Sequence, residues 1–504
     1  NTRWIESLKI AWLPMLVADL FAFGVLCGDF ISNSTWAGHV TYSMILNYSK
    51  SLPELVLESP PLAFGSAIGA FGFLLLVWSY ARRSDWWMQW FLIGTQNGTN
   101  AMRSRLRSLV LMMFYCFALR MSLSQTFALD DPQRWAGEPY SNFFLHFIPA
   151  FPAGDFKSVN QLEATASIDV SGPRNVIIIV SDALRADHLD FYGYTRTTSP
   201  FLSPLVAAGE LVKFDDVYAA CPDSVCGIAS ILSSRGINHL TQDSVHIGDV
   251  LRHHGYQSTF IVTGAHEWGG LTHFYRADRF LDGVGRDGFL VNDDLGTIND
   301  LRRMTFESNK PQFLYVHLYS SHVLGEKLHK FQRWTPSQEP FNPISQYLMD
   351  EEERREIDVN KYDNGVLQAD AMIELVFTEL RKKGLLDKAL VVITADHGEG
   401  LLEHTSSRHS FDLFDEFLRI PLLIRDTESH QYATQAAALQ IDIAPTLLDA
   451  LGLEPPAAWR GTSLRRPVPS PRISFHAARI TEGWKALVCR SDEVRVKYMW
   501  RGPN

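Results

Sequence analysis

Three apolar stretches dominate the start of the chain: Ile10–Cys27, Leu62–Tyr80 and Leu109–Leu129. A helix needs roughly 20 mostly apolar residues to cross the hydrocarbon core of a bilayer. The second stretch contains no charged residue and carries two glycines in the GxxxG spacing that permits close helix contact in lipid. A single stretch of this kind could be a buried helix of a soluble core, but three in series favour membrane spans. We predict a transmembrane helical domain over residues 1–130, with at least three spans.

The basic residues around these stretches set an orientation. With three spans, seven of them fall on one side of the membrane: Arg3, Lys9, Arg82, Arg83, Arg103, Arg105 and Arg107. That side is expected to be cytoplasmic, which places everything after residue 130 outside. Asp19 and Arg120 fall mid-span, where an unpaired charge is costly, so we hypothesise that they face each other. Contact between Arg120 and a lipid head group is the alternative.

A different pattern follows a proline-containing linker, predicted over residues 131–173. Short apolar runs rich in β-branched residues recur, with helical periodicity between them, as in Val366–Lys383. Such runs are typical of strands that are buried on both faces. The runs are Asn175–Ser181, Ser258–Thr263, Gln312–His317 and Ala389–Thr394. The alternation predicts an α/β domain over residues 174–504, with a mostly parallel sheet sandwiched by helices.

Charge separates the two parts and narrows the function. Residues 1–130 hold nine Lys/Arg and seven Asp/Glu, a net charge of +2, whereas the remainder holds 37 and 49, a net charge of -12. An acidic external domain argues against nucleic-acid binding through phosphate contacts. The content of 46% hydrophobic residues excludes a disordered chain, and five Cys in 504 residues exclude a disulfide-framed mini-domain.

Candidate chemistry lies at the ends of two predicted strands and at the start of a helix. Asp182 directly follows the first strand, and Asp396 and His397 follow the Ala389–Thr394 strand. Carboxylates and an imidazole at the carboxyl edge of a parallel sheet indicate a divalent-metal site. The alternative is a capping Asp and a satisfied surface His, but two such strand ends in one domain favour the metal. Ser224 precedes an apolar helical run. It is either a plain helix cap or a hydroxyl that can attack an anionic group bound at the helix N-terminus.

The order of five motifs carries a family resemblance. They are Ser181-Asp-Ala-Leu-Arg-Ala-Asp-His188, Thr394-Ala-Asp-His-Gly-Glu399, Phe414–Ile424, Ile441–Leu448 and Gly461-Thr-Ser-Leu464. Over residues 174 to about 465, the chain resembles the alkaline phosphatase superfamily on its sulfatase-like branch. The resemblance implies the α/β fold of that superfamily and a metal-dependent enzyme.

The nucleophile segment separates the branches of that superfamily. Ser224 falls where sulfatases carry the residue that is converted to formylglycine, a conversion associated with Pro or Ala at +2 and Arg at +4. Here these positions are Cys226 and Ile228, so the resemblance implies that Ser224 stays a plain hydroxyl. A plain hydroxyl suits phosphoryl-type transfer, in which a second acceptor releases the intermediate.

The combination of membrane spans with a following domain of this type resembles the phosphoethanolamine and phosphoglycerol transferases. Those enzymes carry Thr at the position of Ser224 and commonly Glu at that of Asp182, and these departures leave the donor head group and the acceptor open. The resemblance implies one catalytic metal on Asp182, Ser224, Asp396 and His397, with Zn²⁺ expected first and Mn²⁺ or Mg²⁺ as alternatives.

Further residues carry implied roles. His322 and His409 match substrate-side histidines, either of which could protonate the leaving group. His404 is a weaker substrate-binding candidate, as is His317, which could simply end a strand, and the match of Lys327 to a sulfatase lysine is loose. Cys221 and Cys226, which flank Ser224, are expected to form a disulfide, the alternative being two buried thiols.

The expected function is therefore a membrane-anchored, metal-dependent transferase at the outer face of a bacterial cytoplasmic membrane. It would move a phospholipid head group, through Ser224, to a glycan or a lipid-linked sugar. A membrane-bound phosphodiesterase or sulfatase with water as acceptor is the alternative, and a non-catalytic regulator is a third class. The segment Phe331–Glu356 is expected to be a solvated loop, with a role in acceptor choice as the alternative.

Overall fold

The computed structural model describes the second of these two parts. The described residues are 174–501 without 242–243, 265, 267–270, 273, 284–291, 338–349, 405–408, 410–411, 430, 479–483 and 492–493. The three predicted spans, the Asp19–Arg120 pair and the linker lie outside the described residues. Within the described part, no helix has both the length and the apolar character that crossing a bilayer requires.

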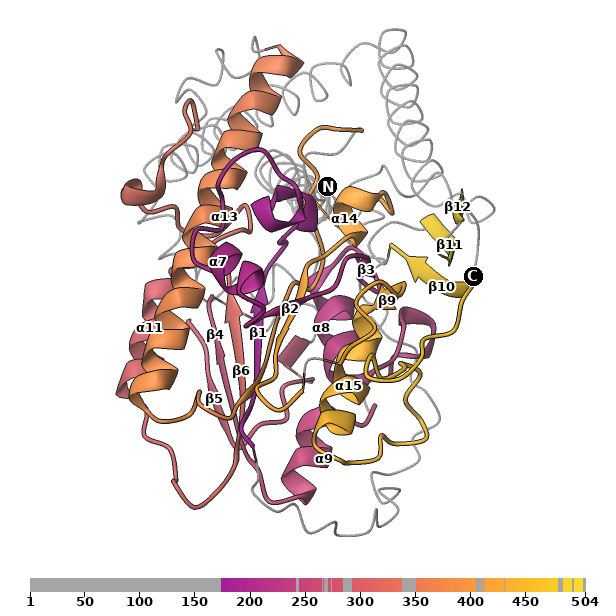
Figure 1. The fold of residues 1–504 in the computed structure, drawn as a ribbon. Coiled ribbons are helices and arrows are strands. Elements are labelled where there is room, and N and C mark those ends of the chain that lie inside the picture. Colours follow the sequence, from indigo (N-terminus) through magenta and orange to yellow (C-terminus); the bar gives the residue numbers. More distant parts are fainter. Residues whose placement is uncertain are drawn as a thin grey trace, which may run out of the picture. The chain divides into compact units, whose positions relative to one another are not determined.

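A seven-stranded sheet forms the centre of the domain (Figure 1). In spatial order its strands are β2 (Val212–Lys213), β8 (Leu422–Arg425), β7 (Leu390–Thr394), β1 (Val176–Ser181), β6 (Gln312–Leu318), β4 (Gln257–Val262) and β5 (Arg279–Leu281). The strands from β7 to β5 are mutually parallel, and β8 runs antiparallel to β7. The predicted mostly parallel α/β sheet is thus confirmed.

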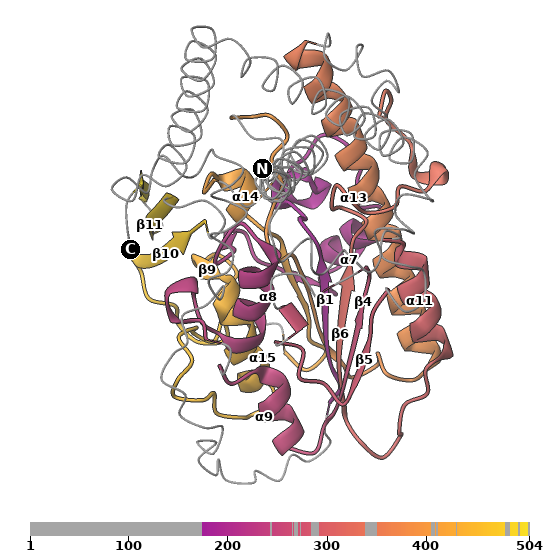
Figure 2. The same ribbon diagram turned by 180° about the vertical axis from the view of Figure 1, so that it is seen from behind.

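Alternating side chains of β1 supply two hydrophobic cores, which explains why the sheet is covered on both faces. All six residues of β1 are buried; Ile177 and Ile179 belong to one core, and Ile178 and Val180 to the other. Figures 1 and 2 show the two layers of helices. One layer contains α8 (Ser224–Ser233), α9 (Ile247–His253) and α15 (Ile443–Ala450), and the other α7 (Leu202–Ala207), α11 (Asp294–Arg303) and α13 (Glu351–Lys382).

Smaller elements complete the described part. An antiparallel sheet contains β10 (Arg472–Ala477), β11 (Trp484–Arg490) and β12 (Arg495–Arg501), and β3 (Val217–Tyr218) pairs with β9 (Ala438–Leu439). The short helix α14 spans Asp415–Leu418. Single turns of 3-10 helix are η3 (Ala186–His188), η4 (Asp190–Tyr192), η5 (Ile237–His239), η7 (His329–Phe331) and η8 (Gln440–Asp442).

The loop expected over Phe331–Glu356 is wrong at its C-terminal end. Glu351–Glu356 form the first turns of α13, and the Asp350 side chain caps the helix by accepting a hydrogen bond of 2.8 Å from the Glu353 N–H. Residues 352–356 are exposed, as expected for a solvated segment, but acidic residues in a first turn favour a helix because they complement its dipole.

Asp370 gives this fold a pH-dependent contact between α13 and α7. Its carboxyl accepts hydrogen bonds from the backbone N–H groups of Phe201 (2.7 Å) and Leu202 (3.0 Å). Burial outweighs these bonds and raises the pKa of Asp370 from 3.8 to about 7. Because the pKa of Asp370 is higher in the folded than in the unfolded protein, its protonation stabilises the fold. This contribution is complete below the unfolded pKa of 3.8 and is lost as the pH rises through the folded pKa of about 7.

We therefore expect Asp370→Asn to flatten the pH dependence of stability. In urea unfolding, the difference in unfolding free energy between pH 5 and pH 8 should be smaller in the variant than in the wild type. An unchanged difference would mean that Asp370 is ionised throughout this range.

Candidate active site

Three neighbouring strands bring the first candidate residues to one edge of the sheet. In the register of β1 with its two neighbours, Val180 is aligned with both His317 of β6 and Thr394 of β7. Asp182 and Asp396 each lie two residues beyond that row. Because side chains two residues apart in a strand project to the same face, the two carboxylates and the imidazole converge at the carboxyl edge.

The geometry of this cluster fits a cation. His317 Nε2 lies 3.7 Å from Asp182 Oδ2 and 3.9 Å from Asp396 Oδ2, and all three side chains are buried. Asp182 Oδ1, His317 Nε2 and Asp396 Oδ2 have no hydrogen-bond partner among the described residues. Unpaired buried polar atoms of this kind are costly, and a divalent ion bound between them would satisfy all three. The carboxylates and the imidazole are donors that Zn²⁺ accepts.

His397 and Ser224 adjoin this cluster. His397 Nε2 lies 3.5 Å from Asp396 Oδ2, 3.8 Å from Asp182 Oδ1 and 3.0 Å from Ser224 Oγ. The other ring nitrogen, Nδ1, is 2.7 Å from the Gly398 carbonyl, which can only accept. The Nδ1 atom therefore carries the proton, and the Nε2 lone pair points toward the serine and the carboxylates. The structure thus brings together the four predicted metal ligands, whose role in binding stays a prediction.

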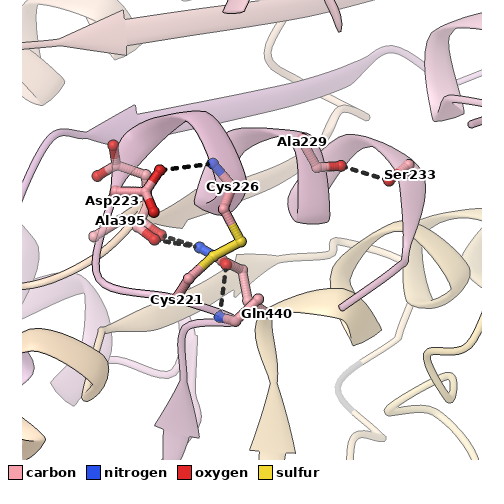
Figure 3. The surroundings of a disulfide bond; sticks show 9 residues. Cys221, Asp223, Cys226, Ala229, Ser233, Ala395 and Gln440 are labelled. Atoms are coloured by element: carbon pink, nitrogen blue, oxygen red, sulfur yellow. Dashed lines mark hydrogen bonds between the residues drawn. A yellow bond between two sulfur atoms is a disulfide. The ribbon is translucent and has the colours of Figure 1, made fainter. Parts of the chain in front are cut away.

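Two interactions fix the start of α8, where Ser224 lies. Figure 3 shows the residues that make them, Asp223 and the Cys221–Cys226 pair. Asp223 is the N-cap residue, and its side chain accepts a hydrogen bond of 3.1 Å from the Cys226 N–H. Cys221 and Cys226 are joined in a disulfide, with a Cα–Cα distance of 6.1 Å. Ser224 is the first residue of the helix rather than its cap, so its hydroxyl is directed into the site while Asp223 satisfies the helix terminus.

A second group of side chains lies against the first. His409 Nδ1 is 3.0 Å from Glu399 Oε1, and the His409 ring lies 4.3 Å from the ring of His397 and 5.0 Å from that of His322, measured between centroids. His322 Nδ1 accepts a hydrogen bond of 3.1 Å from the Leu324 N–H, while its Nε2 lies 4.0 Å from Asp182 Oδ1. Both predicted substrate-side histidines are therefore next to the cluster around Ser224.

Their surroundings differ in electrostatic character. Burial, and then the neighbouring His409, lowers the pKa of His322 well below its usual value. Burial also lowers the pKa of His409, but the charge and hydrogen bond of Glu399 outweigh it and raise that pKa above its usual value. His409 is accordingly the better candidate for a group that carries and donates a proton near neutral pH.

Two weaker candidates do not enter the cluster. His404 Nδ1 is 2.6 Å from Glu416 Oε1, its ring is stacked on Phe414 at 3.7 Å, and 48% of its side chain is exposed. Lys327 is half-buried, and its ammonium donates to the backbone carbonyls of Ser320 and His322 at 2.5 and 2.7 Å. Burial lowers the pKa of Lys327 to about 7. Lys327 therefore supports the loop that carries His322.

Sequence reasoning underrated His317 and missed Glu399. His317 was expected to be a weaker candidate that could simply end a strand. It is the last residue but one of β6, at the edge of the sheet where Asp182 and Asp396 follow the neighbouring strands. The signal was available, because the rule that gathers the carboxyl ends of parallel strands applies equally to the Gln312–His317 run. Glu399 lies two residues after His397, and its pairing with His409 depends on a loop path that periodicity does not encode.

Comparison with known proteins places this chain in a family. The sequence model described as Sulfatase matches residues 174–453. Arylsulfatase K from Bos taurus is 25% identical over 358 residues, which is 58% of this chain and 65% of that protein. Kdo(2)-lipid A phosphoethanolamine 7''-transferase from Salmonella typhimurium is 25% identical over 286 residues, covering 52% of this chain and 46% of the transferase. The chain thus matches less than two thirds of the length of either relative.

A solved structure has the same fold. The C-terminal periplasmic domain of EcEptC from Escherichia coli superposes with a TM-score of 0.50 at 16% identity, covering 62% of this chain and 91% of that domain. The predicted superfamily resemblance is confirmed. Since the family match extends over more than half of the 504 residues, this chain belongs to the sulfatase family.

Proposed function

We propose that this protein is a metal-dependent transferase that passes a phospholipid head group through a covalent intermediate on Ser224. The observation that carries the proposal is the serine hydroxyl itself. Ser224 is the first residue of α8 and is buried. Its Oγ lies 3.0 Å from His397 Nε2 and 3.4 Å from Asp182 Oδ2.

The surroundings of Ser224 favour an unmodified hydroxyl over a formylglycine. The +2 position is Cys226, which is held in the disulfide with Cys221, and the +4 position is Ile228, which is buried in the hydrophobic core. Neither position carries a residue associated with conversion. A formylglycine hydrate can expel sulfate through its second hydroxyl, whereas a plain serine ester needs an external acceptor. This difference supports transfer over sulfate hydrolysis.

We assign the metal to the buried donors at the strand ends. Asp182, Asp396 and His397, joined by Ser224, would hold Zn²⁺, with Mn²⁺ or Mg²⁺ as alternatives, and His317 Nε2 would be a further donor to the same ion. When bound there, the cation would lower the pKa of the serine hydroxyl and draw negative charge from the phosphoryl oxygens.

The protein groups then account for the remaining chemistry. Ser224 Oγ reacts as the alkoxide: it forms a bond to phosphorus as the bond from phosphorus to the diacylglycerol oxygen breaks, and the alkoxide is restored when the acceptor takes the phosphoryl group. The N–H groups in the first turn of α8, apart from that of Cys226, which Asp223 caps, stabilise charge on the phosphoryl oxygens. His409, paired with Glu399, donates a proton to the leaving diacylglycerol oxygen. In the second half, an acceptor hydroxyl gives its proton back to His409 and takes the phosphoryl group from Ser224.

The choice of a lipid donor rests on the apolar N-terminal part. An enzyme anchored by spans in the bilayer meets a membrane-resident donor at high effective concentration. The Salmonella relative is named as a lipid A phosphoethanolamine transferase, which supports a lipid-linked sugar or glycan acceptor here. The proposed location is the outer face of a bacterial cytoplasmic membrane, with the described domain on the periplasmic or extracellular side.

A head-group transfer assay tests the proposal. Full-length protein in nanodiscs should release diacylglycerol from phosphatidylethanolamine or phosphatidylglycerol with an isotope-labelled head group. A glycolipid fraction added as acceptor should speed this release and take up the label. Label appearing as free head-group phosphate at the same rate without acceptor would instead identify a phosphodiesterase. Turnover of aryl sulfates but not of phospholipids would identify a sulfatase.

A further inference from the structure

The side chain of Gln440 connects two segments of the candidate site. One is the segment before Ser224, and the other is the segment that contains Asp396. Gln440 lies in η8 and is completely buried. Its Oε1 accepts a hydrogen bond of 3.0 Å from the Ala220 N–H, at the start of the segment that leads to Ser224. Its Nε2 donates to the backbone carbonyls of Ala395 (3.0 Å) and Asp396 (2.7 Å). Figure 3 shows this bridge beside the disulfide.

The hydrogen bonds use the whole amide in one orientation. An amide oxygen accepts and an NH₂ group donates twice, which matches one backbone N–H and two carbonyls. No other orientation of the side chain satisfies these three partners. Loss of the amide would leave buried backbone groups of two different loops unpaired, which is costly.

The Asp396 carbonyl also lies directly against α8. A Cβ atom at Gly227 would lie 2.3 Å from this carbonyl oxygen, so the helix that begins with Ser224 approaches the backbone of Asp396 directly. The Asp396 carboxylate is fixed separately, because Oδ1 accepts hydrogen bonds of 3.0 Å from the N–H groups of both Ala183 and His397. Oδ2 is left facing His317 and His397.

From this arrangement we propose that Gln440 is a positioning residue, which sets the separation between Ser224 and the donor atom Oδ2 of Asp396. It touches neither of these atoms and acts through the backbone at both ends. The inference rests on the proposed metal site, because outer-shell partners of this kind fix the orientation of the groups that bind the ion.

The test replaces the amide without changing its size. We expect Gln440→Met to weaken Zn²⁺ binding by about 10–100-fold, the range typical for loss of an outer-shell partner. The affinity would be measured by competition between metal-free full-length protein and a chromophoric chelator. Diacylglycerol release should lose kcat with little change in KM for the lipid, because the substrate-side histidines are untouched.

Gln312 provides the matched control. It is a buried glutamine at the start of β6, the opposite edge of the sheet, and its Nε2 also donates to two backbone carbonyls, those of Glu307 and Lys310. Gln312→Met should lower the melting temperature by a similar amount but leave Zn²⁺ affinity unchanged. Equal Zn²⁺ affinity in the two variants and the wild type would overturn the positioning role.

Two further outcomes separate this inference from the proposed function. If Gln440→Met does not fold, Gln440→Asn keeps a polar amide but is too short to reach both loops, and it should show the same loss of Zn²⁺ affinity. If the wild type binds Zn²⁺ but transfers no head group, the proposed function fails, while the difference between the glutamine variants still decides the role of Gln440. A wild type that binds no divalent ion would overturn the inference.

Discussion

Replacement of Ser224 by alanine is expected to reduce head-group transfer by roughly 10⁴-fold or more, the scale seen when a covalent nucleophile is removed. The loss should appear in kcat, because Ser224 forms its bond to phosphorus only as the reaction proceeds. The fold should survive, since Asp223 rather than Ser224 caps α8 and the Cys221–Cys226 disulfide is retained. Diacylglycerol release in nanodiscs measures the rate, and circular dichroism checks the fold.

Ser224→Thr is the matched variant. It keeps a hydroxyl at the first position of the helix and has the residue found in the transferases that this chain resembles. Measurable transfer by the threonine variant, with none by the alanine variant, would assign the chemistry to the hydroxyl. If the alanine variant kept more than a tenth of the wild-type rate, water or another side chain would be the nucleophile.

The second large effect is expected at Asp182. In the metal-free protein, burial and the neighbouring charges of Asp396 and Glu399 disfavour its ionised form. Asp182→Asn removes that unfavourable charge while keeping the shape, so the metal-free variant should melt at the same temperature as the wild type or higher. Zn²⁺ at about 100 times its dissociation constant should stabilise the wild type by about 2.7 kcal/mol. The variant should show almost none of this gain and should lose transfer activity.

A variant that is as stable as the wild type without Zn²⁺ but gains almost nothing from added Zn²⁺ has lost a metal ligand and not a structural carboxylate. Asp294 is the comparison, because it is also a buried carboxylate close to the sheet edge, but its oxygens accept hydrogen bonds from Tyr319, Ser320 and Thr263. Asp294→Asn should destabilise the protein with and without Zn²⁺ and leave the gain from the ion intact. If Asp182→Asn behaved in the same way, Asp182 would be part of the scaffold. Thermal melts with and without added Zn²⁺ measure both.

Much of the sheet was predictable because its strands are buried on both faces. A run such as Val176–Ser181 must be apolar throughout when helices cover both sides, and this composition is visible without any partner. The direction of β8 was not predictable, since antiparallel pairing with β7 changes only which backbone groups meet. An apolar run reads the same in either direction.

In the small C-terminal sheet, β10 reverses the usual alternation, which explains why this strand was missed. Arg472 is buried in an ion pair with Asp442, whereas its neighbour Ile473 is 66% exposed. In a strand with alternating apolar and polar residues, the apolar residues are normally taken to face the core. Here this assumption assigns both residues to the wrong face of the sheet. Such an inversion depends on a partner carboxylate that lies 30 residues away in sequence.

The candidate site divides in a similar way. Asp182, Asp396 and His397 were found because they directly follow strands, and Ser224 because it begins a helix. Gln440 carries no sequence signal of its own, since its importance comes from three backbone groups that meet only in the folded chain. His404 lies near the late motif in sequence, but its ring is stacked on Phe414 and paired with Glu416, so its predicted substrate contact stays a prediction.

The intermediate on Ser224 is the central claim, and intact-protein mass spectrometry of the quenched enzyme tests it most directly. Full-length protein in phosphatidylethanolamine or phosphatidylglycerol nanodiscs, quenched in acid without acceptor, should gain the mass of one phosphorylated head group. Peptide mapping should place that mass on Ser224, and added acceptor should remove it. A protein that releases diacylglycerol while its own mass stays unchanged throughout turnover would contradict the account.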